Sequence, residues 1–277
     1  MINWYPGHMA KAKKEITNNL KLVDVVYEIV DARIPKSSRN PDFDEIIGEK
    51  KRIILLNKED LADENITEKW IEHYKKSGIE AVKINSITGR GFKELEKKTK
   101  EVCKEILEKK VQKGLTPRLR GMILGIPNVG KSTFINTLIG EKKAKTGNKP
   151  GVTKNLHWIR TQYIDLLDTP GILWPKFEDK TTGLMLAITG AIKDEILDVE
   201  EVALYLVFIL KNRYPDHLIN RYKLDKIWEE EIKIIEEIGK KRGCFVSGGK
   251  VDFMKASFLL LEDFRRGNLG RISLEEP

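Results

Sequence analysis

Short runs of consecutive apolar residues, separated by amphipathic stretches, dominate the first part of the chain. Unbroken apolar runs are typical of strands in a parallel sheet that helices cover on both faces. Helical stretches lie between the runs, for example residues 64–78, which open with polar residues and close at Gly78. This alternation predicts an α/β fold. The predicted strands span residues 22–32, 51–57, 79–85, 120–126 and 163–169.

The strand-like runs stop near residue 178, and the remaining apolar positions follow helical periodicity. Pro215 and several glycines separate these helical stretches. We therefore predict a mostly parallel α/β domain over residues 1–178 and a smaller all-helical domain over residues 179–277. The predicted helical stretches are residues 181–197, 198–214, 226–243 and 250–267.

Charge and composition narrow the class of protein. The formal net charge of +8 over 277 residues favours a polyanionic partner. No apolar run approaches the roughly 20 residues that cross a bilayer, and the first residues show no signal-peptide core. With only two cysteines, we expect a cytoplasmic protein with reduced thiols and no membrane span. A lysine cluster fits either an RNA contact or a solvated loop, and consists of Lys142, Lys143, Lys145, Lys149 and Lys154.

Residues 125–133, GIPNVGKST, match a phosphate-binding loop between a predicted strand and a helix-like stretch. Gly130 lets the backbone approach closely, so that N–H groups at a helix N-terminus can point at phosphate oxygens. Lys131 supplies a positive charge to the terminal phosphates, and the Ser132 hydroxyl can bind Mg²⁺. The residues expected to contact the phosphates are Asn128, Val129, Gly130, Lys131, Ser132 and Thr133.

Two further features follow this loop along the chain. Asp168 ends an apolar run, where metal-binding acids of such proteins lie, and the Gly171 N–H can meet a γ-phosphate. Thr153 could close over Mg²⁺ only when a γ-phosphate is present, although alone it would be an ordinary loop residue. We therefore expect Ser132, Thr153 and Asp168 to bind Mg²⁺.

Residues 57–60, NKED, match the N-K-x-D pattern that reads guanine. The Asp60 carboxylate can accept hydrogen bonds from guanine N1–H and N2–H₂, while Asn57 and Lys58 brace the loop and cover the base. Residues 85–86 follow a predicted strand and can offer backbone donors to guanine O6. The residues expected around the base are Asn57, Lys58, Glu59, Asp60, Asn85 and Ser86.

The guanine motif precedes the phosphate loop, the reverse of the familiar order. Sheet packing depends on which strands are neighbours, so termini that lie close together can be joined and the chain opened elsewhere. Residues 92–118 would then be the joining helix and linker. The sequence thus predicts a circularly permuted phosphate-loop GTPase domain.

The sequence resembles the circularly permuted GTPases, and among them the ribosome biogenesis GTPase A family of bacteria. The resemblance implies GTP hydrolysis coupled to late assembly of the large ribosomal subunit. It also implies a helical C-terminal domain that contacts ribosomal RNA, in a protein that we expect to be monomeric away from the ribosome. The motifs that carry it are WYPGHMAKA (4–12), DARIP (31–35), NKED, GIPNVGKST, DTPG (168–171) and DFRRGNLGRISLE (263–275).

Catalysis is less clearly marked. Ras-like enzymes place a water-positioning glutamine just after the DTPG glycine, but this chain has Ile172, so we expect slow hydrolysis until the ribosomal particle stimulates it. His8 is a candidate for the missing role, with a surface histidine near RNA as the alternative. Asn128 resembles the asparagine that binds K⁺ in potassium-stimulated GTPases, with loop bracing as the alternative.

Two other function classes compete with a ribosome-assembly GTPase. Ile172 leaves open an RNA-binding scaffold that binds GTP with little turnover. A small-molecule phosphotransferase is disfavoured by the guanine motif. For RNA binding we expect Arg265, Arg266 and Arg271 to act with residues 142–154, the alternative being that the tail's apolar residues pack it onto the helical core.

Overall fold

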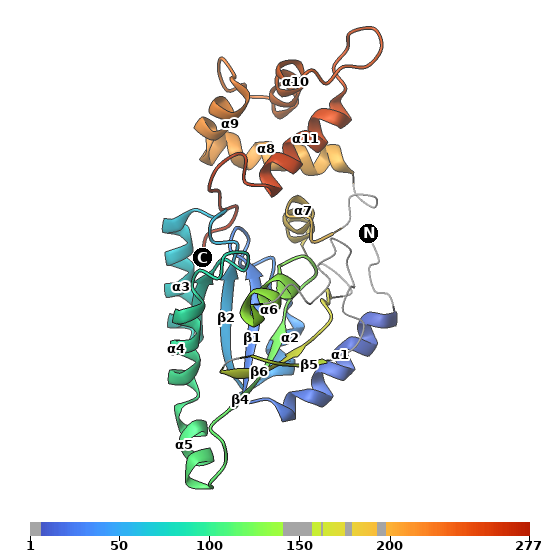
Figure 1. Cartoon of the computed structure of the whole chain (residues 1–277). Helices are drawn as coiled ribbons and strands as arrows, with labels where there is room; N and C mark the ends of the chain where they lie inside the picture. The colour runs from blue at the N-terminus through green and yellow to red at the C-terminus, as the bar shows by residue number, and fades with distance from the viewer. Residues whose placement is uncertain (1–6, 141–156, 162, 175–178, 193–197) are drawn as a thin grey trace. The chain divides into compact units, whose positions relative to one another are not determined.

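The computed structural model describes residues 7–140, 157–161, 163–174, 179–192 and 198–277 (Figure 1). The chain divides into two compact units. Unit 1 comprises Met1–Phe177 together with Glu275–Pro277, and unit 2 comprises Glu178–Leu274. The end of the chain, which the sequence pattern assigned to the helical part, therefore belongs to unit 1. Among the described residues, no helix is long and apolar enough to cross a membrane.

Unit 1 contains a six-stranded sheet in the order β3-β2-β1-β4-β6-β5. Every neighbouring pair is parallel except β5 with β6. Five strands match the predicted apolar runs, whereas β5 is an edge strand whose residues are mostly exposed. The strands are β1 (Val25–Asp31), β2 (Lys51–Asn57), β3 (Glu80–Ile84), β4 (Leu119–Leu124), β5 (His157–Arg160) and β6 (Ile164–Asp168).

The strand order shows why the motifs can be rearranged along the chain. β4, which precedes the phosphate loop, pairs with β1 on one side and with β6 on the other. Its Gly121 is required there, because a Cβ would lie 2.8 Å from Ile164 Cδ1 and 2.9 Å from Leu166 Cδ2. The carboxyl ends of the parallel strands meet at one edge of the sheet, and the predicted nucleotide loops follow them.

Helices cover both faces of this sheet (Figure 1). Val26 of β1 belongs to a buried cluster with residues of α1 and α2, while Tyr27 points to the opposite face. There its hydroxyl lies 2.7 Å from the Thr99 hydroxyl of α4, and its ring packs edge-on against Phe134 of α6. The helices of unit 1 are α1 (Gly7–Asn19), α2 (Asp42–Ile47), α3 (Glu64–Lys76), α4 (Phe92–Val102), α5 (Lys104–Gln112) and α6 (Lys131–Ile139).

Local sequence explains where α3 begins and which face it buries. Asp63 caps the helix, because its carboxylate accepts hydrogen bonds from the backbone N–H groups of Asn65 and Ile66. Ile66, Trp70 and Tyr74 recur every fourth residue and are all buried in one cluster with Leu56 and other strand residues.

The described regular elements of unit 2 are helices, apart from one antiparallel bridge between Phe245 and Val251. Asp198 and Asp252 cap α8 and α11, and these two helices pack against each other. The sequence pattern does not predict α9, because it treats Pro215 as a break between helices. Pro215 is instead the first residue of α9, and proline suits the first turn of a helix. The helices are α7 (Lys180–Ile188), α8 (Val199–Arg213), α9 (Pro215–Tyr222), α10 (Glu231–Lys241) and α11 (Phe253–Arg265).

The tail after α11 packs onto the helical core of unit 2. Phe264, Leu269 and Ile272 are at most 4% exposed. The Arg265 guanidinium donates hydrogen bonds to the carbonyl oxygens of Ala187 and Ile188 at the end of α7. The apolar contacts fit the packing alternative, which did not foresee that Arg265 itself supports the fold of unit 2.

Candidate nucleotide-binding site

Asn57, the last residue of β2, joins three loops that are far apart in the sequence. Its amide nitrogen donates to the Val129 carbonyl oxygen at 2.6 Å. Its amide oxygen accepts from the Ser86 backbone N–H at 3.0 Å and from the Ser86 hydroxyl at 2.7 Å. The structure thus brings the NKED motif, residues 85–86 and the phosphate loop together at the carboxyl edge of the sheet.

The phosphate loop accommodates Asn57 because residue 130 is glycine. Gly130 has a φ of +102°, and a Cβ at this position would lie 2.4 Å from the Asn57 amide nitrogen. α6 begins directly afterwards at Lys131, so the N-terminus of this helix faces the position expected for phosphates. Thr137 of α6 also donates to the Ser86 carbonyl oxygen at 2.6 Å, which ties the helix to the second base loop.

Lys58 is held by a buried ion-pair cluster that the sequence analysis did not assign. Its amino group lies 2.9 Å from an Asp31 carboxylate oxygen and donates to the Asn128 carbonyl oxygen at 3.1 Å. Arg33 binds the same carboxylate through its Nε and Nη2 atoms at 2.9 and 2.8 Å. Burial raises the pKa of Asp31, but Arg33 and Lys58 together bring it well below its ordinary value. The DARIP motif therefore supplies the anion that positions Lys58.

The remaining residues of the two base loops differ in exposure and in their contacts. Asp60 is exposed at the end of the NKED motif, so its carboxylate is accessible to a base. Glu59 is 3% exposed, and its carboxylate lies 3.4 Å from Arg90 Nη1 of the other base loop. The Asn85 side-chain oxygen accepts from the backbone N–H groups of Ile87 and Thr88, which shapes the turn after β3.

Lys131 and Gly171 meet on the phosphate side of the site. Lys131 is 8% exposed, and its amino group donates to the carbonyl oxygens of Gly125 and Ile126 at 2.9 and 2.8 Å. Burial lowers the pKa of Lys131 to about 8, against the opposing effect of the Asp168 carboxylate. A Cβ on Gly171 would lie 2.8 Å from the Lys131 amino nitrogen, so the DTPG segment lies against the phosphate loop.

The oxygen donors of this edge fit Mg²⁺. Ser132 lies in the first turn of α6, and Asp168, 9% exposed, ends β6 close enough to influence the Lys131 pKa. Mg²⁺ typically takes one or two protein oxygens and completes its shell with phosphate and water. The described residues contain no cluster of three or more acidic, histidine or cysteine side chains. Thr153 and the five clustered lysines lie outside the described residues.

Ile172 is part of the core and not of the phosphate site. It is 2% exposed and shares a buried cluster with Ala12 and Ile16 of α1. Its carbonyl oxygen accepts a hydrogen bond from Asn40 at 3.2 Å. The backbone of His8 lies in the first turn of α1, four residues before Ala12, and its side chain is outside the description.

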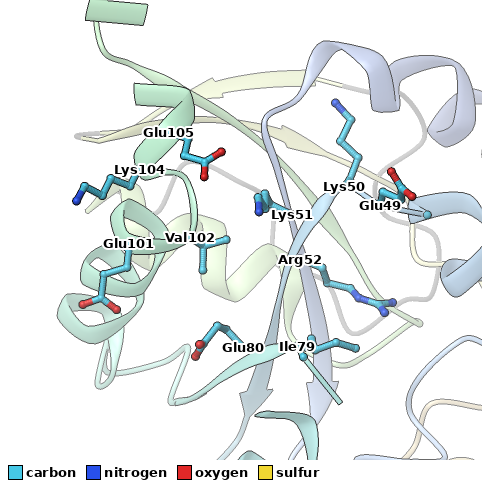
Figure 2. Close-up of a pocket in the computed structure, with 12 residues that line it drawn as sticks. Glu49, Lys50, Lys51, Arg52, Ile79, Glu80, Glu101, Val102, Lys104 and Glu105 are labelled. Atoms are coloured by element: carbon cyan, nitrogen blue, oxygen red, sulfur yellow. The ribbon is translucent and has the colours of Figure 1, made fainter. Parts of the chain in front are cut away.

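A cavity of about 600 Å³ opens at the amino-terminal ends of β2 and β3, the edge of the sheet opposite these loops (Figure 2). Figure 2 shows basic side chains and carboxylates together around it, for example Lys51 of β2 with Glu101 and Glu105 near α4 and α5. Mixed charge gives no net attraction for a triphosphate. The cavity is therefore a poor candidate for a nucleotide site.

Comparisons with known proteins show the family of the chain. The family model described as 50S ribosome-binding GTPase matches residues 120–245. The chain is 50% identical to Ribosome biogenesis GTPase A of Bacillus cereus over 100% of this chain and 94% of that protein. It is 33% identical to Ribosome biogenesis GTPase A of Thermotoga maritima over 100% of this chain and 95% of that protein.

A solved structure described as GNP-bound YlqF from T. maritima is 28% identical, with a TM-score of 0.66. The alignment covers 96% of this chain and 98% of that chain. A GDP-bound structure of TM YlqF gives the same TM-score at 27% identity, covering 95% of this chain and 99% of that chain. With full-length relatives at this level of identity and the guanine and phosphate loops joined at one edge, the chain belongs to the ribosome biogenesis GTPase A family.

Proposed function

We propose that this chain is a GTP-hydrolysing switch that acts in the cytoplasm in late assembly of the large ribosomal subunit. The observation that carries the proposal is the Asn57 side chain, which binds both Ser86 and Val129 and so holds a guanine-reading loop against a phosphate loop. The names of the similar proteins, which include Ribosome biogenesis GTPase A and Mitochondrial ribosome-associated GTPase 1, support the ribosomal role.

Guanine selection rests on Asp60 and on the residues that fix its loop. An exposed carboxylate at this position accepts two hydrogen bonds from guanine, and adenine has no matching pair of donors. Lys58 covers the base, and Asp31 fixes its amino group in place. Because unpaired buried polar groups cost a few kcal/mol each, we expect a GTP preference over ATP of roughly 10³-fold.

Phosphate binding rests on Lys131, the α6 N-terminus and Gly171. Lys131 must leave the Gly125 and Ile126 carbonyl oxygens to reach a phosphate, and phosphate oxygens would replace those acceptors. Bound Mg²⁺ would neutralise charge on the phosphates, held by Ser132, Asp168 and, in the GTP state, Thr153. The Gly171 N–H would sense the γ-phosphate, and its loss on hydrolysis would release the segment that leads to unit 2 at residue 178.

Water activation requires a group other than Ile172, whose side chain is buried. We propose His8 for this role, since α1 packs through Ala12 and Ile16 in the same cluster as Ile172. Asn128 has a φ of +60° and follows Pro127 in the phosphate loop, and we propose it as a ligand for a stimulating K⁺ ion. Hydrolysis would then be slow until the ribosomal particle orders these groups.

The ribosomal partner would be the large subunit and its RNA, bound mainly through unit 2. Arg266, with a side chain that is 72% exposed, is available for phosphate contacts, whereas Arg265 is committed to the fold. We expect the protein to be monomeric away from the particle, which light scattering would test.

GTP hydrolysis with and without purified large-subunit particles tests the proposal, with ATP as the competing substrate. We expect slow GTP turnover that the particles accelerate, and no ATP turnover. Lys131→Ala should lose GTP turnover both with and without particles. Tight GTP binding with no turnover under any condition would favour the RNA-binding scaffold. Phosphate transfer to a small molecule would favour the phosphotransferase.

A further inference from the structure

The last residues of the chain hold a loop of unit 1 through a single carboxylate. Glu275 accepts hydrogen bonds from the backbone N–H groups of Lys36 at 2.8 Å and Ser37 at 3.1 and 3.2 Å. The Ser37 hydroxyl donates to the same side chain. The Glu275 carbonyl oxygen in turn accepts from the Trp70 indole N–H at 3.3 Å. Hydrogen bonds to an ionised carboxylate are stronger than those between two neutral groups. We call these contacts of Glu275 with Lys36 and Ser37 the latch.

The loop that Glu275 holds is connected to the guanine-reading motif through Ser38 and Asp31. Ser38 follows the latched Ser37, and its hydroxyl accepts from the Asp31 N–H at 3.0 Å and donates to the Ile34 carbonyl oxygen at 2.7 Å. Asp31 then holds the Lys58 amino group at 2.9 Å. Hydrogen bonds, with the peptide link from Ser37 to Ser38 between them, thus connect Glu275 through residues 36–38 to Asp31 and on to Lys58.

Glu275 directly follows the last residue of unit 2. The chain leaves unit 1 at Phe177, beyond the Gly171 segment on the phosphate side, and returns to it at Glu275. Unit 2 is therefore connected to the nucleotide site through two covalent links. One leads to the γ-phosphate segment, and the other leads to the latch on the base side.

The loop has other supports, so loss of the latch would loosen it without unfolding it. The Tyr74 hydroxyl of α3 donates to the Pro35 carbonyl oxygen at 3.3 Å. Arg33 also bonds to the Asp31 carboxylate, at 2.9 and 2.8 Å. Lys36 and Ser37 are the residues of the loop that bond directly to Glu275.

We infer that Glu275 is a positioning residue for Lys58, through which unit 2 sets how long guanine nucleotide stays bound. The inference rests on the proposed function, since it requires nucleotide at the NKED loop. When a partner that binds unit 2 pulls the tail away, the Glu275 carboxylate loses its hydrogen bonds to residues 36 and 37. Asp31 is then held less firmly, and Lys58 covers the base less well. Nucleotide release becomes faster from the base side, independently of γ-phosphate chemistry.

Release of a fluorescent GDP analogue from the full chain, followed by stopped flow in Mg²⁺, tests this inference. Glu275→Ala should release the analogue about tenfold faster than the wild type, within the range of typical coupling between sites. Glu275→Gln, which keeps size but loses the charge and half of the acceptors, should lie between. The matched control is Glu276→Gln, since Glu276 is exposed and its carboxylate lies 3.7 Å from the Lys69 amino group.

A double-mutant cycle separates positioning from simple anchoring of the tail. If Glu275 acts through Lys58, Glu275→Ala should add little to the release rate of Lys58→Ala. Large-subunit particles should also change release in the wild type and much less in Glu275→Ala. A lower melting temperature with an unchanged release rate would overturn the inference and leave Glu275 as an anchor. Absence of guanine nucleotide binding in the wild type would instead overturn the proposed function.

Discussion

The Asn57 amide nitrogen lies 2.6 Å from the Val129 carbonyl oxygen, and the same side chain accepts two hydrogen bonds from Ser86. Asn57 at the end of β2 therefore helps to set the distance between the base-reading loops and the phosphate loop, together with the Lys58–Asn128 and Thr137–Ser86 hydrogen bonds. Because the phosphate loop comes later in this chain, no local sequence context maintains that distance. These hydrogen bonds do so across the sheet edge.

Asn57→Ala should weaken binding of both GTP and GDP by roughly 10- to 100-fold. The substitution removes hydrogen bonds worth about 1 kcal/mol each from the Val129 carbonyl and from the Ser86 N–H and hydroxyl. Isothermal titration calorimetry with both nucleotides measures the loss. Asn65→Ala, an exposed asparagine on α3, is the matched control and should bind like the wild type. Equal affinity in both variants would show that the loops keep their spacing without Asn57.

Asp60→Asn should change the base preference from guanine to xanthine, because the amide reverses the donor and acceptor pattern at N1 and C2. We expect GTP affinity to fall roughly 100- to 1,000-fold and xanthosine triphosphate affinity to rise. Competition against a fluorescent guanine nucleotide measures both. Glu59→Gln serves as a control in the same motif, because its side chain is buried toward Arg90 and not exposed to the base. Unchanged GTP affinity in Asp60→Asn would remove Asp60 from the base site.

Lys131 predicts a pH dependence of nucleotide binding. Burial lowers its pKa to about 8 in the nucleotide-free protein, and a bound triphosphate would raise that pKa again. Above pH 8, binding must therefore take up a proton, so affinity should fall as pH rises, by at most tenfold per pH unit. Below pH 8 the lysine is already charged, and affinity should not change through this group.

Calorimetric titrations between pH 6.5 and 9 measure this slope. Lys131→Arg is the control, because arginine stays charged over the whole pH range. The pH dependence of nucleotide affinity in this variant should therefore lack the contribution of Lys131. Ionisation of the guanine base affects both proteins equally and cancels in the comparison. The same slope in both proteins would show that Lys131 is fully charged in the free state.

The parallel strands could be read from the sequence because both faces of the sheet are covered, which leaves continuous apolar runs. β5 could not, because it is an edge strand with exposed residues, such as Trp158 at 44% exposure. The nucleotide loops were recognisable as local motifs. The buried Asp31–Lys58 pair was not, because it depends on the register that places Asp31 opposite Asn57 across two strands. Glu275 was hidden for the same reason, since its partners are more than 200 residues away along the chain.

The two arginines at the end of α11 should respond differently to mutation. The Arg265 side chain is 15% exposed and donates to the last carbonyl oxygens of α7, at 2.8 Å for Ala187 and 3.0 Å for Ile188. Arg265→Ala should therefore lower the free energy of unfolding by about 1–3 kcal/mol, because these carbonyls lose a charged donor. Thermal unfolding followed by circular dichroism measures the change.

Arg266 is the better test of RNA binding, because its side chain is 72% exposed and its ion pair with Glu262 lies on the surface. Arg266→Ala should leave the melting temperature and basal GTP hydrolysis unchanged, since exposed ion pairs contribute little to stability. The same variant should bind large-subunit particles more weakly and reduce the salt dependence by up to about one slope unit. Lys233→Ala, an exposed lysine on α10, controls for the loss of one positive charge from unit 2. If Arg266→Ala and Lys233→Ala bind the particles equally well at every salt concentration, Arg266 contributes only general charge and makes no specific phosphate contact.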